Sequence, residues 1–353
     1  MIKIYDIETL EEREILFRGG SGADVSAPVA EILRAVQERG DAALREYTLR
    51  VDGAAPDALV VTAEEVDRPA AQVEPAFLAV LEEAAEHIRA YHARQKRESF
   101  VMTEREGVVL GQRIIPLARV GIYVPGGTAA YPSTVLMNAI PARIAGVGEI
   151  IMVTPPGRDG AVNPHILAAA KIAGVTRIYK VGGAQAVAAL AYGTGTIPQV
   201  DKIVGPGNAY VAEAKRQVFG RVNIDMIAGP SEVLVLADGR SNPAWVAADL
   251  LSQAEHDRMA AAVLVTDSRP LAEAVAHELE RQLAALPRAE IARASLEANG
   301  KLIVCRDLRE GIAVANRIAP EHLELCVDNP FDYLGEIQNA GSVFLGQIGR
   351  AHV

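Results

Sequence analysis

The chain has 353 residues, enough for two domains or one large, elaborated domain with a sizeable core. Half of the residues are hydrophobic but only 5% are aromatic, a balance that favours α/β layers over an aromatic-rich β-sandwich. The 35 basic and 45 acidic residues give a net charge of −10 with no basic run, which argues against a nucleic-acid partner.

The cysteines and the first residues of the chain indicate a cytoplasmic protein. Cys305 and Cys326 are too few for a disulfide scaffold, and neither belongs to a CxxC pair. Charged residues interrupt the N-terminus where a signal peptide needs a continuous apolar stretch. The longest uncharged stretch, 120–142, contains three Gly and three Pro. This composition disfavours a membrane span, so we expect no membrane partner.

The first part of the chain is predicted to be helical. Residues 1–17 form a charged arm with a weak pattern. Apolar residues then recur with helical spacing over 28–48 and again over 73–95. Gly40 breaks the first of these stretches, and Asp41 is placed to cap a second helix.

The rest of the chain alternates short β-branched runs with Ala-rich helical segments, and Gly or Pro stands at nearly every junction. The first series has expected strands at 120–124, 150–154, 177–181, 202–204 and 233–236, with helices at 133–145, 163–173, 184–191 and 209–219. The second has expected helices at 243–255, 271–283 and 308–317, and strands at 261–265, 302–305, 323–327 and 342–345. This alternation predicts two modules with parallel sheets covered on both faces, joined near residues 228–231.

Glycine-rich turns follow several expected strands, at 125–127, 182–183, 205–208 and 229–231. In an open parallel sheet such turns lie at the carboxyl ends of the strands, where ligands bind and helix N-termini favour anions. The glycines therefore indicate either a dinucleotide site or, more simply, tight turns between strands and helices. The chain has neither GxGxxG nor GxxxxGK[ST], so a nucleotide would be held in a non-standard way.

Two short segments place histidine beside other polar groups. Gln253 and His256 are three residues apart at the end of an expected helix, where they can share a metal or simply form its polar C-terminal turn. Glu321 and His322 follow a helix-ending proline and open a strand, an arrangement suited to general acid–base catalysis. The dipeptide is common by itself, because Glu86-His87 occurs within a helical stretch with no such context.

Six segments in order resemble the L-histidinol dehydrogenase family, and the resemblance extends to Gly346. The segments are 120–127, 179–185, 201–211, 224–233, 251–256 and 319–325. The family uses two NAD⁺ in succession, with Zn²⁺ in the site, to oxidise L-histidinol through the aldehyde to L-histidine, the last step of histidine biosynthesis. The resemblance implies such an oxidoreductase, with L-histidinol as its small-molecule substrate and a homodimer as its assembly.

The resemblance also implies roles for individual residues. Tyr123, Gln185 and Asn208 correspond to NAD contacts, and Ser231, Gln253, His256 and His322 to substrate contacts. Gln253 and His256 are similar to two of the zinc ligands. Glu321 and His322 match the acid–base pair, with His322 expected to deprotonate the alcohol and Glu321 to activate water.

The architecture that the resemblance implies is α/β, with two incomplete Rossmann-like domains. Residues 120–231 would bind NAD, and a discontinuous domain, 18–119 with 232–346, would carry the zinc, substrate and acid–base residues. Residues 1–17 would form an N-terminal arm. In the family a C-terminal domain swaps between subunits and completes the site. That domain is missing here, so we expect this chain to be inactive alone.

Residues 347–353 are expected to be a non-native tail. They have no apolar period and no resemblance to the family's next segment. The peptide QIGRAHV is also the translation of a common short-read library adapter, which has a stop codon next in that frame.

Two other functions remain open at this point. One is another NAD-linked alcohol or aldehyde dehydrogenase, although neither cysteine is placed as a nucleophile on a strained loop. The other is a nucleotide-binding module without catalysis.

Overall fold

The computed structural model describes residues 2–16, 24–54, 56, 58–126, 130–227, 229 and 231–346. The chain forms two compact units: unit 1 is Met1–Gly22 with Gly229–Val353, and unit 2 is Ala23–Ala228. The division lies between Ala228 and Gly229, and the sequence predicts a seam near residues 228–231. The tail expected at 347–353 lies outside the described residues.

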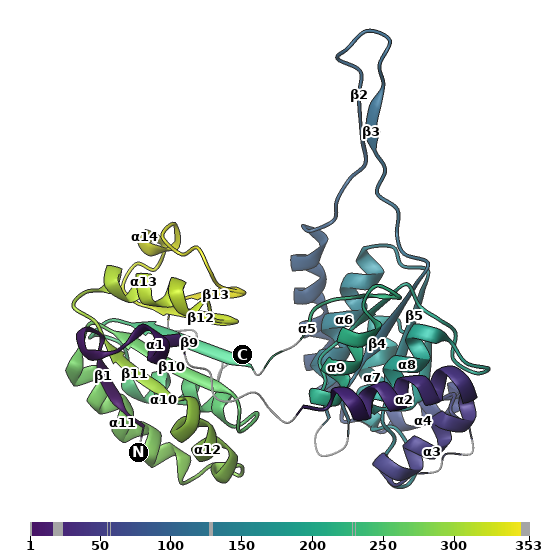
Figure 1. Cartoon of the computed structure of the whole chain (residues 1–353), viewed down its shortest axis with the longest axis horizontal. Helices are drawn as coiled ribbons and strands as arrows, with labels where there is room; N and C mark the ends of the chain where they lie inside the picture. The colour runs from purple at the N-terminus through teal and green to yellow at the C-terminus, as the bar shows by residue number, and fades with distance from the viewer. Residues whose placement is uncertain are drawn as a thin grey trace. The chain divides into compact units, whose positions relative to one another are not determined.

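Unit 2 is built on a five-stranded parallel sheet with strand order β6-β5-β4-β7-β8 (Figure 1). Its strands are β4 (Arg119–Tyr123), β5 (Glu149–Thr154), β6 (Arg177–Lys180), β7 (Lys202–Val204) and β8 (Asn223–Ile224). The β-branched and aliphatic runs of the sequence form these strands, and Gly or Pro at the junctions ends them. The predicted parallel sheet is confirmed.

Helices cover both faces of this sheet. They are α2 (Ser26–Arg39), α3 (Asp41–Asp52), α4 (Ala63–Ala70), α5 (Pro75–Ala93), α6 (Pro132–Ile144), α7 (Pro164–Ala173), α8 (Gly183–Tyr192) and α9 (Ala209–Val218). Ile151 and Val153 of β5 pack with α2, α3, α8 and α9, whereas Ile150 and Met152 pack with α5, α6 and α7. This alternation gives unit 2 one apolar core on each face of the sheet.

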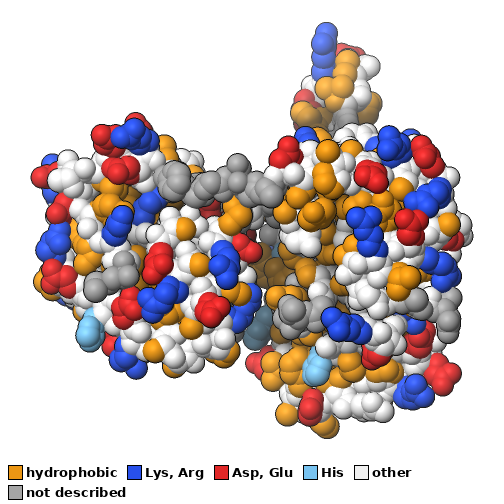
Figure 2. Space-filling model, turned by 60° about the horizontal axis from the view of Figure 1, so that its bottom comes forward, with side chains coloured by type: hydrophobic (Ala, Val, Ile, Leu, Met, Phe, Trp, Pro, Cys, Tyr) orange, Lys and Arg blue, Asp and Glu red, His pale blue; other side chains and the backbone are white. Residues whose placement is uncertain are grey.

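A long hairpin extends from unit 2 between α5 and β4 (Figure 1). Its strands, β2 (Phe100–Met102) and β3 (Leu110–Gln112), pair antiparallel with each other, and all six residues are exposed. Figure 2 shows hydrophobic side chains along this projection. Neither strand was expected from the sequence, whose pattern at 100–112 shows no long apolar run.

Unit 1 contains a six-stranded sheet with strand order β1-β11-β10-β9-β12-β13, parallel throughout. Its strands are β1 (Ile4–Asp6), β9 (Glu232–Ala237), β10 (Ala261–Thr266), β11 (Lys301–Val304), β12 (His322–Cys326) and β13 (Ser342–Leu345). The expected arm therefore contributes an edge strand. Its three residues, Ile-Tyr-Asp, are too few to show an alternating pattern.

The helices of unit 1 also lie on both faces of its sheet. They are the 3₁₀ turn η1 (Ile7–Thr9) and the helices α1 (Glu12–Leu16), α10 (Pro243–Ala254), α11 (Arg269–Leu283), α12 (Ala289–Asn299), α13 (Leu308–Ile318) and α14 (Phe331–Leu334). One core joins α10, α11 and α12 to Val233 and Val235, and the other joins α1 and α13 to Leu234 and Leu236. Asn242 caps α10 as its Asn-Pro sequence suggests, since its Oδ1 accepts a hydrogen bond from Ala244 N at 2.9 Å.

The structure assigns the first helices differently from the expected domain boundaries. Residues 24–119 pack in unit 2, whereas the expected discontinuous domain placed 18–119 with 232–346. The reason is that α2 and α3 bury Val29, Leu33 and Leu44 in the core of unit 2. Asp41 is also not a cap: it is the first residue of α3, and its carboxylate accepts hydrogen bonds from Thr196 N and Oγ1.

No helix of the described residues is both long enough and apolar enough to cross a membrane.

Candidate functional site

The three expected cofactor residues lie together at the carboxyl edge of the sheet in unit 2. Tyr123 ends β4, Gln185 stands in the first turn of α8 directly after β6, and Asn208 precedes α9 directly after β7. Parallel strands end at a common edge, so turns that are far apart in the sequence meet there.

Tyr123 is held in place by the backbone of α8. Its hydroxyl oxygen accepts a hydrogen bond from Gly183 N at 3.0 Å, and the residue is buried. Burial raises the pKa of the Tyr123 hydroxyl to about 12, and the nearby Asp52 carboxylate adds to this effect. Tyr123 therefore stays neutral at physiological pH and can take part in hydrogen bonding.

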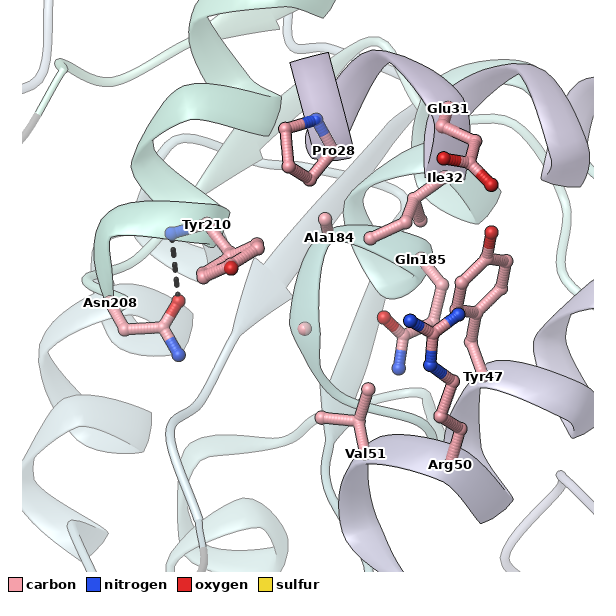
Figure 3. A pocket seen from close by; sticks show the side chains of 11 residues that line it. Pro28, Glu31, Ile32, Tyr47, Arg50, Val51, Ala184, Gln185, Asn208 and Tyr210 are labelled. Atoms are coloured by element: carbon pink, nitrogen blue, oxygen red, sulfur yellow. Dashed lines mark hydrogen bonds between the residues drawn. The ribbon is translucent and has the colours of Figure 1, made fainter. Parts of the chain in front are cut away.

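Asn208 caps α9. Its Oδ1 accepts hydrogen bonds from Tyr210 N and Val211 N, both at 3.1 Å (Figure 3). The turn before it is fixed at Gly205, whose carbonyl accepts a hydrogen bond at 2.9 Å from Nζ of the buried Lys215. Gly205 has a φ of +112°, and a Cβ there would lie 2.2 Å from the Tyr123 carbonyl oxygen, so only glycine fits.

Gln185 and Asn208 both line a pocket of about 390 Å³ (Figure 3). Gln185 is 1% exposed, and its Nε2 has no hydrogen-bond partner among the described residues. A buried amide without a partner costs free energy, so the group is suited to a ligand in the pocket. Pocket residues that the sequence analysis did not single out are Pro28, Glu31, Ile32, Tyr47, Arg50, Val51 and Tyr210.

The residues expected to contact the substrate lie in unit 1, at the amino-terminal edge of its sheet. The cofactor residues, in contrast, lie at the carboxyl edge of the sheet in unit 2. Ser231 precedes β9, and His322 begins β12. Gln253 and His256 lie at the C-terminal end of α10, which runs back from the carboxyl end of β9 to the start of β10. The fold of unit 1 thus brings all four residues to one edge.

Glu321 and His322 form a hydrogen-bonded group with the backbone next to Ser231. His322 Nδ1 lies 3.0 Å from the Glu232 carbonyl oxygen and 3.6 Å from Glu321 Oε2. Glu232 N donates a hydrogen bond to Glu321 Oε2 at 3.3 Å. The imidazole is largely buried, at 20% exposure, whereas the carboxylate is half-exposed at 48%. The pair is therefore fixed in orientation and still open to a ligand.

The backbone before this pair is strained. Ala319 ends α13 with a φ of +51°, in the left-handed region that non-glycine residues seldom adopt. Such strain concentrates at functional sites, where the surrounding structure maintains it. It supports a functional role for the segment that follows, residues 320–322.

Gln253 and His256 differ in exposure. Gln253 is fully buried, and His256 is exposed beside a cavity of about 400 Å³. His256 Nδ1 lies 2.7 Å from the Ser252 carbonyl oxygen, so the imidazole also closes the last turn of α10. Both expectations for this segment, a polar C-terminal turn and a ligand site, are compatible with this arrangement.

A complete metal site is not present among the described residues. No group of three or more His, Cys, Asp or Glu side chains in the described ranges is placed to hold an ion. Gln253 and His256 supply two of the three or four protein ligands that zinc normally takes.

The cysteines are unsuited to nucleophilic chemistry. Cys305 and Cys326 are both buried and unpaired. Burial raises the pKa of the Cys305 thiol to about 12 and raises that of Cys326 as well. A nucleophilic cysteine needs a lowered pKa and access to solvent, so a thiol-dependent aldehyde dehydrogenase is disfavoured.

The family model described as histidinol dehydrogenase matches residues 18–352. A histidinol dehydrogenase of Syntrophotalea carbinolica is 58% identical over 324 residues, covering 91% of this chain and 75% of that protein. One of Geobacter metallireducens is 56% identical over 342 residues, covering 96% of this chain and 78% of that protein.

A solved structure gives the same result. The crystal structure of histidinol dehydrogenase from Elizabethkingia anophelis matches with a TM-score of 0.95 and 40% sequence identity. The match covers 99% of this chain and 81% of that one. The chain belongs to the histidinol dehydrogenase family.

Proposed function

We propose that the protein oxidises L-histidinol with NAD⁺ through the aldehyde to L-histidine, a four-electron oxidation and the last step of histidine biosynthesis. Family membership supports the reaction. The hydrogen-bonded group of Glu321, His322 and the Glu232 backbone is the single observation that carries the proposal, since it provides an oriented acid–base pair.

His322 acts as the base in both oxidative steps. An alcohol releases hydride readily only while its hydroxyl proton is being removed. When Nδ1 donates to the Glu232 carbonyl, the neutral imidazole carries its lone pair on Nε2. That tautomer is the one a base requires, and the backbone acceptor fixes the plane of the ring.

Glu321 acts in the second half of the reaction, where water must add to the aldehyde. Glu321 Oε2 is held by Glu232 N, and Oε1 makes no hydrogen bond to a described residue. The half-exposed carboxylate can therefore accept a proton from water while keeping its orientation.

NAD⁺ is the proposed cofactor, with Tyr123, Gln185 and Asn208 as its contacts. When bound, NAD⁺ would supply the hydride acceptor. The pocket that Gln185 and Asn208 line suits NAD⁺. In it the buried Gln185 amide, whose Nε2 has no hydrogen-bond partner among the described residues, lies beside the N-terminal turn of α8. Tyr123 supports that turn through its hydrogen bond with Gly183.

Ser231, Gln253, His256 and His322 are the proposed substrate contacts, because they share one edge of the sheet. For zinc, Gln253 and His256 are the proposed ligands. The described residues alone do not complete a zinc site, so no step is assigned to the metal.

A cytoplasmic homodimer is the proposed form of the protein. The two unpaired cysteines suit a reducing compartment. The exposed apolar hairpin of β2 and β3 supports self-association, since a contiguous apolar patch on a surface marks an interaction site.

NADH formation on addition of L-histidinol tests the proposal in a full-length protein that contains this sequence and the C-terminal domain, because the 353-residue chain is expected to be inactive alone. His322→Asn should lower turnover by about 10²–10⁴-fold with NAD⁺ affinity retained, since a general base contributes about that factor. Glu321→Gln should slow the aldehyde-to-acid half reaction most. His87→Asn is the control, because His87 also follows a glutamate but lies exposed on α5. Turnover of His322→Asn within a factor of a few of the parent contradicts the proposed role.

A further inference from the structure

The pocket of unit 2 has a second wall, for which neither the sequence nor the family resemblance assigns a role. Helices α2 and α3 provide Glu31, Ile32, Tyr47, Arg50 and Val51, which face the turn after β6 across the pocket (Figure 3).

Arg50 is the cationic group of this wall. Its guanidinium carbon lies 5.9 Å from the ring centroid of Tyr47, which orients the side chain toward the pocket. Tyr47 is only 5% exposed, and its ring packs in the core of unit 2. Of the carboxylates that the structure describes, none forms an ion pair with Arg50, and its five N–H donors remain available to a ligand.

Two further donors face the same space. The Gln185 amide is fully buried, and its Nε2 has no partner among the described residues. The first turn of α8 provides Ala184 N and Gln185 N, which have no intrahelical acceptor. Gly183 shapes this turn with a φ of +64°, and a Cβ there would lie 2.5 Å from Gln185 Oε1. A guanidinium, a primary amide and a helix N-terminus together favour an anion.

The remaining lining narrows the class of anion. Ile32, Val51 and Ala184 make the centre of the pocket apolar, which suits a planar base or the face of a sugar (Figure 3). Glu31 lines the same pocket and pairs with no cation among the described residues. A carboxylate repels bare phosphate but accepts hydrogen bonds from ribose hydroxyls. A pocket with an apolar centre, a carboxylate and several anion-binding donors suits a nucleotide better than an inorganic anion.

We propose that Arg50, with the Gln185 amide and the first turn of α8, forms a phosphate subsite for the nucleotide cofactor. The inference rests on the proposed function, because it takes the cofactor to be a dinucleotide. It assigns binding of a cofactor phosphate to α3, which the expected domain boundaries placed in the other domain.

The test is calorimetric titration of the 353-residue chain with ADP, adenosine, inorganic phosphate and NAD⁺. Arg50→Gln should weaken ADP and NAD⁺ binding by about 10- to 100-fold, the usual range for loss of a charge-assisted hydrogen bond. Adenosine affinity should change less than twofold, and Arg50→Lys should retain part of the ADP affinity. Inorganic phosphate should bind much more weakly than ADP. Arg34→Gln is the matched control, since Arg34 is exposed on α2 outside the pocket.

The outcomes separate this inference from the proposed function. Equal ADP affinity of Arg50→Gln and the parent overturns the phosphate subsite, even if the parent oxidises L-histidinol with NAD⁺. Arg50-dependent ADP binding by a chain that does not bind NAD⁺ supports the subsite and contradicts the proposed cofactor. Equal loss of adenosine and ADP affinity in Arg50→Gln also overturns the inference, because it indicates a collapsed pocket rather than a lost phosphate contact.

Discussion

Asp52 is an acidic residue whose environment disfavours its charged form. It is the last residue of α3, and its Oδ2 is shielded from solvent without a hydrogen-bond partner among the described residues. Burial raises the pKa of the Asp52 carboxyl from 3.8 to about 6. Above pH 6 the folded protein therefore carries a poorly solvated carboxylate close enough to Tyr123 to raise the pKa of its hydroxyl.

The sign of the effect on stability follows from this shift. Between pH 4 and pH 6 the folded state holds the Asp52 proton more tightly than the unfolded state, so stability falls as the pH rises through this window. Asp52→Asn should therefore raise the free energy of unfolding at pH 8 by about 1 kcal/mol, and have little effect at pH 4. The full shift would correspond to about 3 kcal/mol, but part of the carboxyl faces solvent.

Urea unfolding of both proteins at pH 4 and pH 8 measures this difference. Glu82→Gln provides the control, because Glu82 is exposed on α5 and has no described partner. A stabilisation that is the same at both pH values would show that the charge of Asp52 is not its cause.

Some site residues could be predicted from the sequence, and others could not. The family resemblance implied Gln185 and Asn208, and the sequence pattern predicted only that the glycine-rich turns beside them lie at the carboxyl edge of a parallel sheet. Arg50 and Glu31 lie on helices whose periodicity identifies only the buried face. Nothing in their spacing shows which exposed positions border a pocket, because that depends on how α2 and α3 pack on α8.

At the scale of elements, the strands of the β2–β3 hairpin are exposed at every position and bury no side chain against another described element. Phe100, Val101, Met102 and Leu110 are 44–70% exposed, and Met102 lies directly opposite Leu110 in the antiparallel register. An isolated two-stranded hairpin is marginal in water. We therefore expect it to be buried in the homodimer.

Leu110→Lys should weaken the homodimer by about 10- to 100-fold, since burial of a leucine side chain contributes about 1.5–3 kcal/mol. Sedimentation velocity over a range of protein concentrations gives the dissociation constant. Val80→Lys introduces the same charge at another exposed apolar position, on α5, and should leave the assembly intact. A dimer of unchanged affinity in Leu110→Lys would exclude the hairpin from the interface.

Element boundaries were predictable where a β-branched or apolar run is followed directly by Gly or Pro. The strands expected at 202–204 and 342–345 are β7 and β13 without change. The helices α4 and α12 were not predicted. The strands that were not predicted are short and at an edge, such as β1 and β8, or lack apolar partners, such as the hairpin strands. In these segments pairing with a neighbour, rather than local pattern, decides the structure.

At the scale of the whole molecule, the division of the chain depends on long-range packing. The sequence predicts a seam near residues 228–231, because glycine and proline interrupt the β/α series there, and the chain divides between Ala228 and Gly229. It could not show which sheet α2 and α3 cover, since an amphipathic helix pattern predicts burial but not the partner. The structure places both helices in unit 2, beside the pocket that we assign to the cofactor.

This division predicts that the two ligands protect different units from hydrogen exchange. The amides of Ala184 and Gln185 have no intrahelical acceptor, so a bound phosphate should slow their exchange strongly, together with that of the last turn of α3. NAD⁺ should therefore protect peptides of unit 2, and L-histidinol should protect peptides at the start of β9 and β12 in unit 1.

Mass spectrometry of exchanged peptides from the 353-residue chain, with each ligand alone, measures this protection. Adenosine is the control for NAD⁺, because it lacks phosphate and should leave the first turn of α8 close to its unliganded rate. Protection by NAD⁺ confined to unit 1 would contradict the assignment of the cofactor to unit 2. Such a result would also leave the glycine at position 183 without a ligand-binding role, since the turn where a Cβ would meet Gln185 Oε1 would then face no ligand.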